Sequence, residues 1–205
     1  MRDYQVEDFS KFTREQLAKI DNRELIIDAH KKAFKYTNQQ RRALDVGCKF
    51  GFYAELLVKD FMYVDCFDMR NKIRNNILAQ ENLRFQSIAI GDKNSTVTYQ
   101  GDVIDYVADK TKPVSYTKQI TLDSLNYNDV DYIKIDTEGH ELKVLQGCEE
   151  TLKRTHPVIV LEQNDTVVRY GKGVMYDAID WLRQRDYKLV EHNGLDDWIM
   201  AFVDT

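Results

Sequence analysis

From residue 43 onward, short apolar runs alternate with stretches in which apolar residues recur at helical spacing. The runs predicted as strands are ALDV, MYVDCF, LRFQSIAI, DYIKID and PVIVLE. The stretches predicted as helices are FYAELLVKD, NKIRNNILAQE, ELKVLQGCEETLKR and VMYDAIDWLRQR. Because strands and helices follow one another in turn, the pattern predicts an α/β fold with a parallel sheet covered by helices.

Three regions depart from this alternation. Residues 1–40 combine helical apolar spacing with a capping-box sequence, TREQ, at 13–16, so we expect an N-terminal helical extension before a domain spanning 41–205. Residues 91–125 contain short β-rich runs without a complete strand–helix unit, and we expect inserted strands and a loop over one edge of the sheet. At the end, YKLVEH, NGLD and DWIMAFV predict a hairpin with an antiparallel strand.

Composition and charge narrow the class of protein. Of 205 residues, 43% are apolar and 31% charged, with nine Gly and two Pro, which is typical of a folded globular domain. The net charge of -5 is spread along the chain and does not favour a nucleic-acid partner. No run approaches the ~18 apolar residues of a membrane span, and the first residues lack the apolar core of a signal peptide. We therefore expect a cytoplasmic protein without a membrane partner.

The cysteines do not suggest a metal site or a disulfide framework. Cys48, Cys66 and Cys148 are odd in number, lie in apolar surroundings and lack the spacing of metal ligands. This usage is typical of reduced, buried thiols.

A glycine turn and a distant acid form the first candidate site. LDVGCKFGFY places Gly47 and Gly51 between a strand and a helix, where glycine permits close approach of a ligand to the backbone. Asp68 ends the next strand, 21 positions after Gly47, where an acid can accept both hydroxyls of a ribose. The spacing is wider than the G-x-G-x-x-G of dinucleotide sites and favours a nucleoside without a diphosphate, such as S-adenosylmethionine. Alternatively, the glycines only form the turn and Asp68 caps a helix.

These stretches resemble the FkbM-type S-adenosylmethionine-dependent methyltransferases, within the class I, Rossmann-like methyltransferases. The resemblance follows the chain in order through LDVGCKFGFY, CFDM, SIAIGDKNSTVT, ITLDSL, DYIKIDTEGHELKVLQGCEETL and PVIVLEQN. Its most specific part is TLDSL followed closely by IKIDTEGHE. The resemblance implies a mostly parallel seven-stranded sheet with helices on both faces and a C-terminal antiparallel strand. It also implies methyl transfer to an oxygen of a saccharide or a similar small molecule.

The resemblance also implies the roles of individual residues. S-adenosylmethionine would be bound by Asp45, Gly47, Lys49, Gly51, Tyr53, Asp68, Met69, Ser87, Ala89 and Asp136. The acceptor side would hold Glu138, His140 and Glu162, which with Asp136 are the candidate catalytic residues, and residues 91–125 would cover that side. Lys49 stands where the family motif DVGANIG has an asparagine. A cation there could repel the sulfonium of the cofactor or pair with its carboxylate.

The acidic stretch DTEGHE leaves several assignments open. Glu141 fits compensation of a helix dipole, whereas Asp136 lies at the carboxyl edge of the sheet, where open α/β folds bind ligands. His140 is the preferred general base, because a histidine with a pKa of about 6.5 is partly neutral at physiological pH. Glu138 or Glu162 could serve instead if burial raises its pKa, or could orient the imidazole.

Three other functions remain as alternatives. Asp136, Glu138 and Glu162 could hold a divalent cation, as in catechol-type O-methyltransferases, although clustered acids are a weaker signal than spaced His and Cys ligands, and we predict no metal. An NAD-linked oxidoreductase would need a different glycine spacing. A non-catalytic nucleoside-binding module is suggested only by Lys49.

Overall fold

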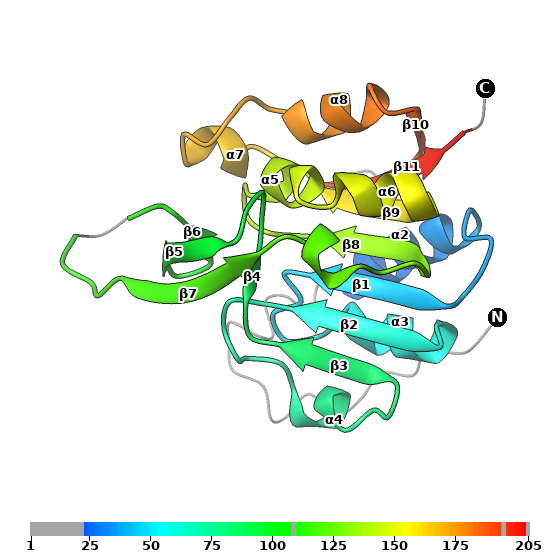
Figure 1. The fold of residues 1–205 in the computed structure, drawn as a ribbon, viewed down its shortest axis with the longest axis horizontal. Coiled ribbons are helices and arrows are strands. Elements are labelled where there is room, and N and C mark those ends of the chain that lie inside the picture. Colours follow the sequence, from blue (N-terminus) through cyan, green and yellow to red (C-terminus); the bar gives the residue numbers. More distant parts are fainter. Residues whose placement is uncertain (1–22, 108–109, 194–195, 204–205) are drawn as a thin grey trace.

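The computed structural model describes residues 23–107, 110–193 and 196–203, and its main element is a seven-stranded sheet (Figure 1). The strands are β1 (Arg42–Val46), β2 (Tyr63–Phe67), β3 (Leu83–Gln86), β8 (Val130–Ile135), β9 (Val158–Glu162), β10 (Tyr187–His192) and β11 (Asp197–Phe202). Their order is β10-β11-β9-β8-β1-β2-β3. Neighbours from β3 to β9 are parallel, and β11 is antiparallel to both of its neighbours. The structure confirms the predicted Rossmann-like sheet with its antiparallel C-terminal strand.

Helices cover both faces of this sheet because alternate strand residues point to opposite sides. One apolar core contains Leu44 and Val46 of β1 together with side chains of α5 (Glu141–Gln146), α6 (Glu149–Thr155) and α8 (Asp177–Arg183). The other contains Ala43 and side chains of α2 (Arg23–Phe34), α3 (Ala54–Asp60) and α4 (Asn75–Leu78). Two short helical turns, η2 (Asp123–Leu125) and α7 (Thr166–Arg169), complete the described helices.

Helix α2 is part of the packed domain rather than a separate arm. It contacts β9, β10 and β11, and its Ala29 and Ala33 are fully buried. Residues 1–22, which include the capping-box sequence TREQ, lie outside the described residues. The predicted boundary between an extension over 1–40 and a domain over 41–205 stays a prediction.

The stretch ELKVLQGCEETLKR forms two helices rather than the single helix predicted. Helix α5 ends at Gln146, and α6 begins at Glu149. Between them, a Cβ placed on Gly147 would lie 1.9 Å from the carbonyl oxygen of Gly91. The close approach of these two backbones requires glycine and interrupts the helix. The predicted helix NKIRNNILAQE is likewise reduced to the single turn α4.

A second, four-stranded sheet lies at the carboxyl ends of the parallel strands, at the left of Figure 1. Its strands are β4 (Ala89–Ile90), β5 (Ser95–Gln100), β6 (Val103–Ile104) and β7 (Ser115–Ile120), in the order β4-β7-β5-β6. The run LRFQSIAI, predicted as one strand, therefore divides between the two sheets. The division follows from pairing, because Ala89 and Ile90 align with β7 whereas β3 aligns with β2.

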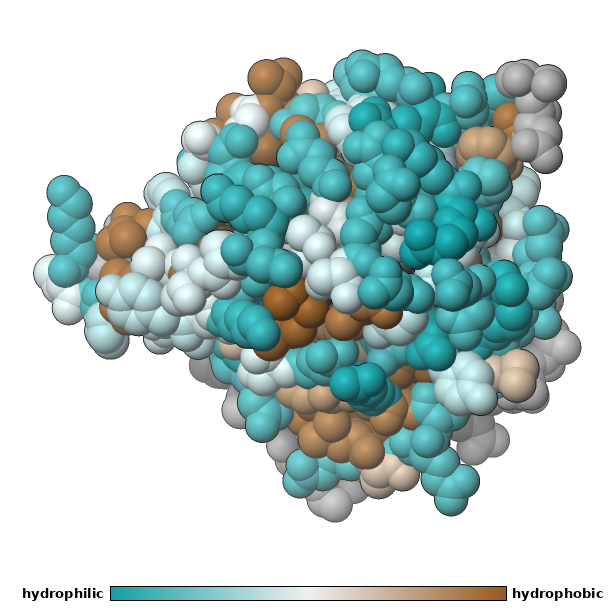
Figure 2. Space-filling model, in the orientation of Figure 1, coloured by the Kyte–Doolittle hydropathy of each residue, from teal (hydrophilic) through white to brown (hydrophobic). Residues whose placement is uncertain are grey.

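The surface seen in Figure 2 is largely hydrophilic, with apolar residues in small patches. Within the described ranges, no helix combines the length and apolar character needed to cross a bilayer. Cys48, Cys66 and Cys148 are all buried free thiols.

Candidate active site

The glycine turn after β1 is formed where the ends of two neighbouring strands converge. Gly47 has a φ of +85°, and its N–H donates to the carbonyl oxygen of Phe67 at 2.8 Å. A Cβ on Gly47 would lie only 1.8 Å from the carbonyl oxygen of Asp136, directly after β8. Both the positive φ and this close approach require glycine. The turn continues through Lys49, with a φ of 47°, and Gly51, with a φ of 76°.

Asp68 connects the glycine turn to the end of β2. Its Oδ2 accepts the backbone N–H of Lys49 at 2.9 Å, and its Oδ1 accepts the backbone N–H of Arg70 at 2.8 Å. Burial raises the pKa of Asp68, although the N–H groups of Arg70 and Lys49 oppose this shift. Each carboxylate oxygen can accept a second hydrogen bond. The side chain is therefore fixed in place and can still bind the two hydroxyls of a ribose.

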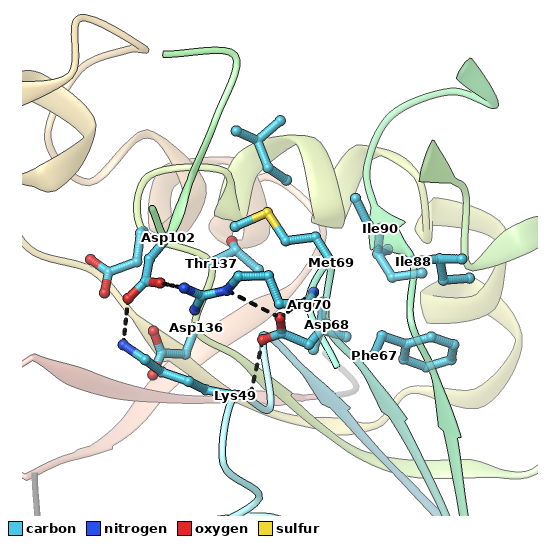
Figure 3. Close-up of a pocket in the computed structure, with 15 residues that line it drawn as sticks. Lys49, Phe67, Asp68, Met69, Arg70, Ile88, Ile90, Asp102, Asp136 and Thr137 are labelled. Atoms are coloured by element: carbon cyan, nitrogen blue, oxygen red, sulfur yellow. Dashed lines mark hydrogen bonds and ion pairs between the residues drawn. The ribbon is translucent and has the colours of Figure 1, made fainter. Parts of the chain in front are cut away.

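Asp68 forms part of a first pocket between the two sheets, shown in Figure 3. Its apolar wall consists of Phe67, Met69, Ile88, Ala89, Ile90 and Ile104. Met69 and Ala89, two of the predicted cofactor-binding residues, thus line the same pocket as Asp68. Ser87 is exposed and is not among the lining residues of this pocket.

Three charged side chains close one side of the first pocket (Figure 3). Asp102 lies in the turn between β5 and β6 and forms ion pairs with the Lys49 ammonium and the Arg70 guanidinium. Neither Arg70 nor Asp102 was among the site residues predicted from the sequence. The position of Arg70, two residues after the predicted ribose acid, was a usable signal. Asp102 has no such signal in the sequence, because it reaches the pocket only through the pairing of the strands in the second sheet.

A second pocket lies on the other side of the glycine turn. It shares Gly47, Lys49 and Asp136 with the first pocket. Its other polar and aromatic lining residues include Asp45, Tyr53, Lys134, Glu162, Asn193, Asp196 and Asp197. The two pockets meet at Gly47, Lys49 and Asp136, so one ligand can extend through both.

Asp45 offers an unused hydrogen-bond acceptor to the second pocket. The residue is only 1% exposed, and its Oδ2 has no hydrogen-bond partner among the described residues. Burial raises the pKa of Asp45 to about 7, with the Lys134 ammonium opposing that shift. Buried polar groups normally have partners, so this oxygen marks a position for a ligand donor.

Asp136 and Glu162 form a carboxyl pair at the ends of β8 and β9. The Asp136 carboxylate and burial raise the pKa of Glu162 far above its ordinary value, and the two side chains are hydrogen-bonded. Two carboxylates this close do not both ionise readily, so the pair retains a proton at neutral pH. Lys134 lies nearby and donates to Asp197 at 2.8 Å. Burial would lower the pKa of Lys134, but Asp197, Asp136 and Glu162 outweigh burial and keep the amine charged.

Glu141 shapes the loop DTEGH in addition to starting α5. Its Oε1 accepts the backbone N–H of Thr137 at 3.0 Å, the Thr137 hydroxyl at 3.0 Å and the backbone N–H of Gly139 at 2.9 Å. Glu138 and Gly139 have φ values of 54° and 90°. The loop is thus held in a left-handed turn, and Glu138 lines the first pocket.

His140 lies apart from the Asp136–Glu162 pair. It is 2% exposed, lines neither pocket described above, and its Nε2 lies 3.0 Å from Gln119 Oε1. The Gln119 amide donates its own N–H to the carbonyl oxygen of Lys93, which orients Oε1 toward the imidazole and makes Nε2 the donor. The left-handed turn before His140 directs the side chain toward the second sheet. Burial, with Lys172 and Lys143, lowers the pKa of His140 to about 3.

Replacing His140 by Ala is expected to lower stability without lowering the turnover number of the folded enzyme. The variant leaves a cavity and removes the donor to Gln119, a loss of about 2–4 kcal/mol in the free energy of unfolding. The unfolded chain gains a proton below the ordinary pKa of 6.5 while the folded chain resists it until about 3. Acid therefore destabilises the wild type through this residue, and the variant lacks that contribution. Urea titrations at several pH values measure the free energy of unfolding, and steady-state assays measure the turnover number. A hundred-fold loss of turnover in well-folded His140→Ala would restore His140 as the base.

The predicted alternative metal ligands are divided between the two pockets. Glu138 lines the first pocket and Glu162 the second, with Asp136 at their junction. Across the described part of the chain, no group of three or more His, Cys, Asp or Glu side chains has an arrangement that could hold a metal ion. The described residues thus provide no ligand set for the divalent cation of the catechol-type alternative.

Solved structures of several methyltransferases share the fold of this chain. Similar solved structures include a methyltransferase FkbM from Methylobacillus flagellatus KT, with 11% identity, a TM-score of 0.51, and coverage of 91% of this chain and 60% of that one. N-methyltransferase NodS from Bradyrhizobium japonicum WM9, in complex with S-adenosyl-L-homocysteine, has 10% identity, a TM-score of 0.56, and coverage of 93% and 92%. A SAM-dependent methyltransferase from Aquifex aeolicus has 19% identity, a TM-score of 0.51, and coverage of 93% and 98%. These low identities establish the fold alone.

The sequence itself supplies the family. No curated protein sequence matches the chain. Residues 68–189, more than half of it, match the methyltransferase FkbM domain. That segment begins at Asp68, the predicted ribose-binding acid, and includes Asp102, Asp136 and Glu162. The chain therefore belongs to the FkbM methyltransferase domain family.

Proposed function

We propose that the protein transfers the methyl group of S-adenosylmethionine to a hydroxyl of a saccharide or a similar small molecule. The observation that carries this proposal is the Asp136–Glu162 carboxyl pair, which lies in the second pocket beside the junction with the first. A hydroxyl is a poor nucleophile unless a nearby group takes its proton. The pair supplies such a group at the end of the sheet where the cofactor pocket ends.

The residues of both pockets fit the cofactor. The apolar wall of the first pocket suits an adenine ring, and the two oxygens of Asp68 suit the ribose hydroxyls. In the second pocket, the unpartnered Oδ2 of buried Asp45 suits the ammonium of the amino-acid part. Tyr53 lines the same pocket, and its hydroxyl is hydrogen-bonded to that of Tyr132 at 2.5 Å.

The chemistry follows from the state of the carboxyl pair. When bound, S-adenosylmethionine supplies a methyl group activated by a positively charged sulfur. The Asp136–Glu162 pair carries one proton and one negative charge at neutral pH, so its ionised oxygen can accept the proton of an acceptor hydroxyl. Lys134 stabilises the charged state of the pair, and Asp136 belongs to both pockets. Holding the hydroxyl in line with the methyl group is itself worth several kcal/mol.

The polar side of the second pocket supports a hydroxyl-rich acceptor. Asn193, Asp196 and Asp197 line it together with the apolar side chains of Leu25 and Ile26. Carboxylate and amide oxygens accept hydrogen bonds from hydroxyls, and apolar surfaces pack against the C–H faces of a sugar ring. These features support the second pocket as the binding site of the acceptor.

An acceptor panel tests the proposal. Full-length protein is incubated with methyl-deuterated S-adenosylmethionine and with neutral saccharides, primary amines or catechols, each with and without EDTA, and products are identified by mass spectrometry. We expect a methyl ether on a saccharide, formed at the same rate with and without EDTA. A methylated amine, or a catechol ether lost on chelation, would contradict the proposed acceptor or the metal-free chemistry.

A further inference from the structure

The ion pairs of Asp102 bring a compensating charge to the glycine turn. Lys49 follows β1, Arg70 follows β2, and Asp102 comes from the tip of the β5–β6 hairpin in the second sheet. Arg70 also lies near Asp68, with Nε 3.9 Å from Oδ1. In Figure 3 the side chains of Lys49, Arg70, Asp68 and Asp102 form one connected network at the pocket wall.

Lys49 lies at the junction of the two pockets, where its charge can affect the affinity for a charged cofactor. It lines both pockets and, with Gly47 and Asp136, forms their junction. A ligand that extends through both pockets must pass this lysine. S-adenosylmethionine carries a positive sulfonium, whereas its product S-adenosylhomocysteine has a neutral thioether in the same place. In a partly buried site, one uncompensated unit charge a few ångströms away is sufficient to change affinity by about ten-fold or more.

Within the network, charge balance depends on Asp102. Lys49 and Arg70 each contribute +1, Asp68 and Asp102 each contribute -1, and the sum is zero. Without Asp102 the sum becomes +1, next to the junction. With Lys49 replaced by a neutral residue and Asp102 retained, the sum becomes -1. The balance is therefore adjustable in both directions by single substitutions.

We propose that Asp102 is a specificity-determining residue that makes the lysine-containing glycine turn compatible with a positively charged cofactor. By pairing with Lys49 and Arg70, it removes their repulsion of the sulfonium and preserves the preference for S-adenosylmethionine over its neutral product. The turn and the hairpin thus act together, because Lys49 of the turn is paired with Asp102 of the hairpin. This inference rests on S-adenosylmethionine being the cofactor.

Calorimetry on the full-length protein tests the inference with two ligands, S-adenosylmethionine and S-adenosylhomocysteine. Asp102→Asn is expected to weaken S-adenosylmethionine binding about ten-fold more than S-adenosylhomocysteine binding. The double variant Lys49→Asn/Asp102→Asn returns the network sum to zero and is expected to restore the wild-type ratio of affinities. Asp105→Asn is the matched control, because Asp105 is an exposed carboxylate just after the same hairpin strand and lines neither pocket.

The ratio of the two affinities in the Asp102 and Lys49 variants decides the inference. Equal losses for both ligands in Asp102→Asn, or no loss, would overturn the role of Asp102 in charge compensation. If Asp102→Asn does not fold, Lys49→Asn alone gives the test: the preference for S-adenosylmethionine must rise, and an unchanged ratio would overturn the inference. Wild-type protein that binds neither ligand would instead contradict the cofactor assignment.

Discussion

Replacing Asp68 by Ala is expected to weaken binding of S-adenosylhomocysteine by at least about 100-fold. The carboxylate accepts the backbone N–H groups of Lys49 and Arg70, and its remaining acceptor sites suit the two ribose hydroxyls. Hydrogen bonds to a charged group contribute about 1.5–3 kcal/mol each, so loss of the two to ribose alone gives a factor of this size. Isothermal titration calorimetry measures the change.

Two further variants separate recognition of the ribose from loss of the turn. Asp68→Asn keeps the shape and one acceptor oxygen but replaces the other by a donor, and its affinity should lie between those of wild type and Asp68→Ala. Asp92→Ala removes an exposed carboxylate that lines neither pocket, and it should bind as wild type does. Undiminished affinity in well-folded Asp68→Ala would contradict the assignment of Asp68 to the ribose.

The glycine turn and Asp68 were predictable because the residues that form them lie within one strand–helix–strand unit. The turn follows β1 directly, and the end of β2 positions Asp68 so that it accepts the backbone N–H of Lys49 in that turn. Here sequence spacing and spatial distance agree. The roles of Asp102 and Gln119 were not predictable in the same way, since both depend on how the second sheet pairs and packs.

His140 illustrates the limit of proximity in sequence. It lies four residues after Asp136, yet the left-handed conformations of Glu138 and Gly139 come between them and the imidazole packs against Gln119. A positive φ at glutamate is not expected from its side chain. The structure therefore gives the loop a form that helical or strand periodicity does not predict.

Charged residues inside the predicted strands were a further signal of the functional site. Asp45 in β1 is aligned with Lys134 in β8, and both are buried at the second pocket. In ALDV and DYIKID these residues interrupt otherwise apolar runs of the kind that fill a parallel sheet. Such local inconsistencies are expected at functional sites, where chemistry rather than packing determines the side chain. Lys134 was the residue that this reasoning could have added.

Replacing Asp136 by Asn is expected to lower turnover by roughly 100- to 10,000-fold, because Asp136 is the ionised member of the carboxyl pair and therefore its base. Glu162→Gln replaces a protonated carboxyl by a neutral amide in the second pocket, and it should leave most of the turnover and the S-adenosylhomocysteine affinity unchanged. Single-turnover rates and calorimetry measure the two effects separately. Glu81→Gln, which removes an exposed carboxylate, is the control and should retain both properties.

Glu162→Gln has a predicted effect on stability whose sign follows from the carboxyl pair. Above the ordinary glutamate pKa of 4.5 the unfolded chain releases the proton, while Asp136 and burial keep it on Glu162 in the folded protein. The folded state then binds more protons than the unfolded state, so stability falls as pH rises above about 4.5. Glu162→Gln lacks this penalty and should melt at a higher temperature than wild type at pH 8, with a smaller difference at pH 5. Intact turnover in Asp136→Asn, together with its loss in well-folded His140→Ala, would move the general base from the carboxyl pair to the histidine.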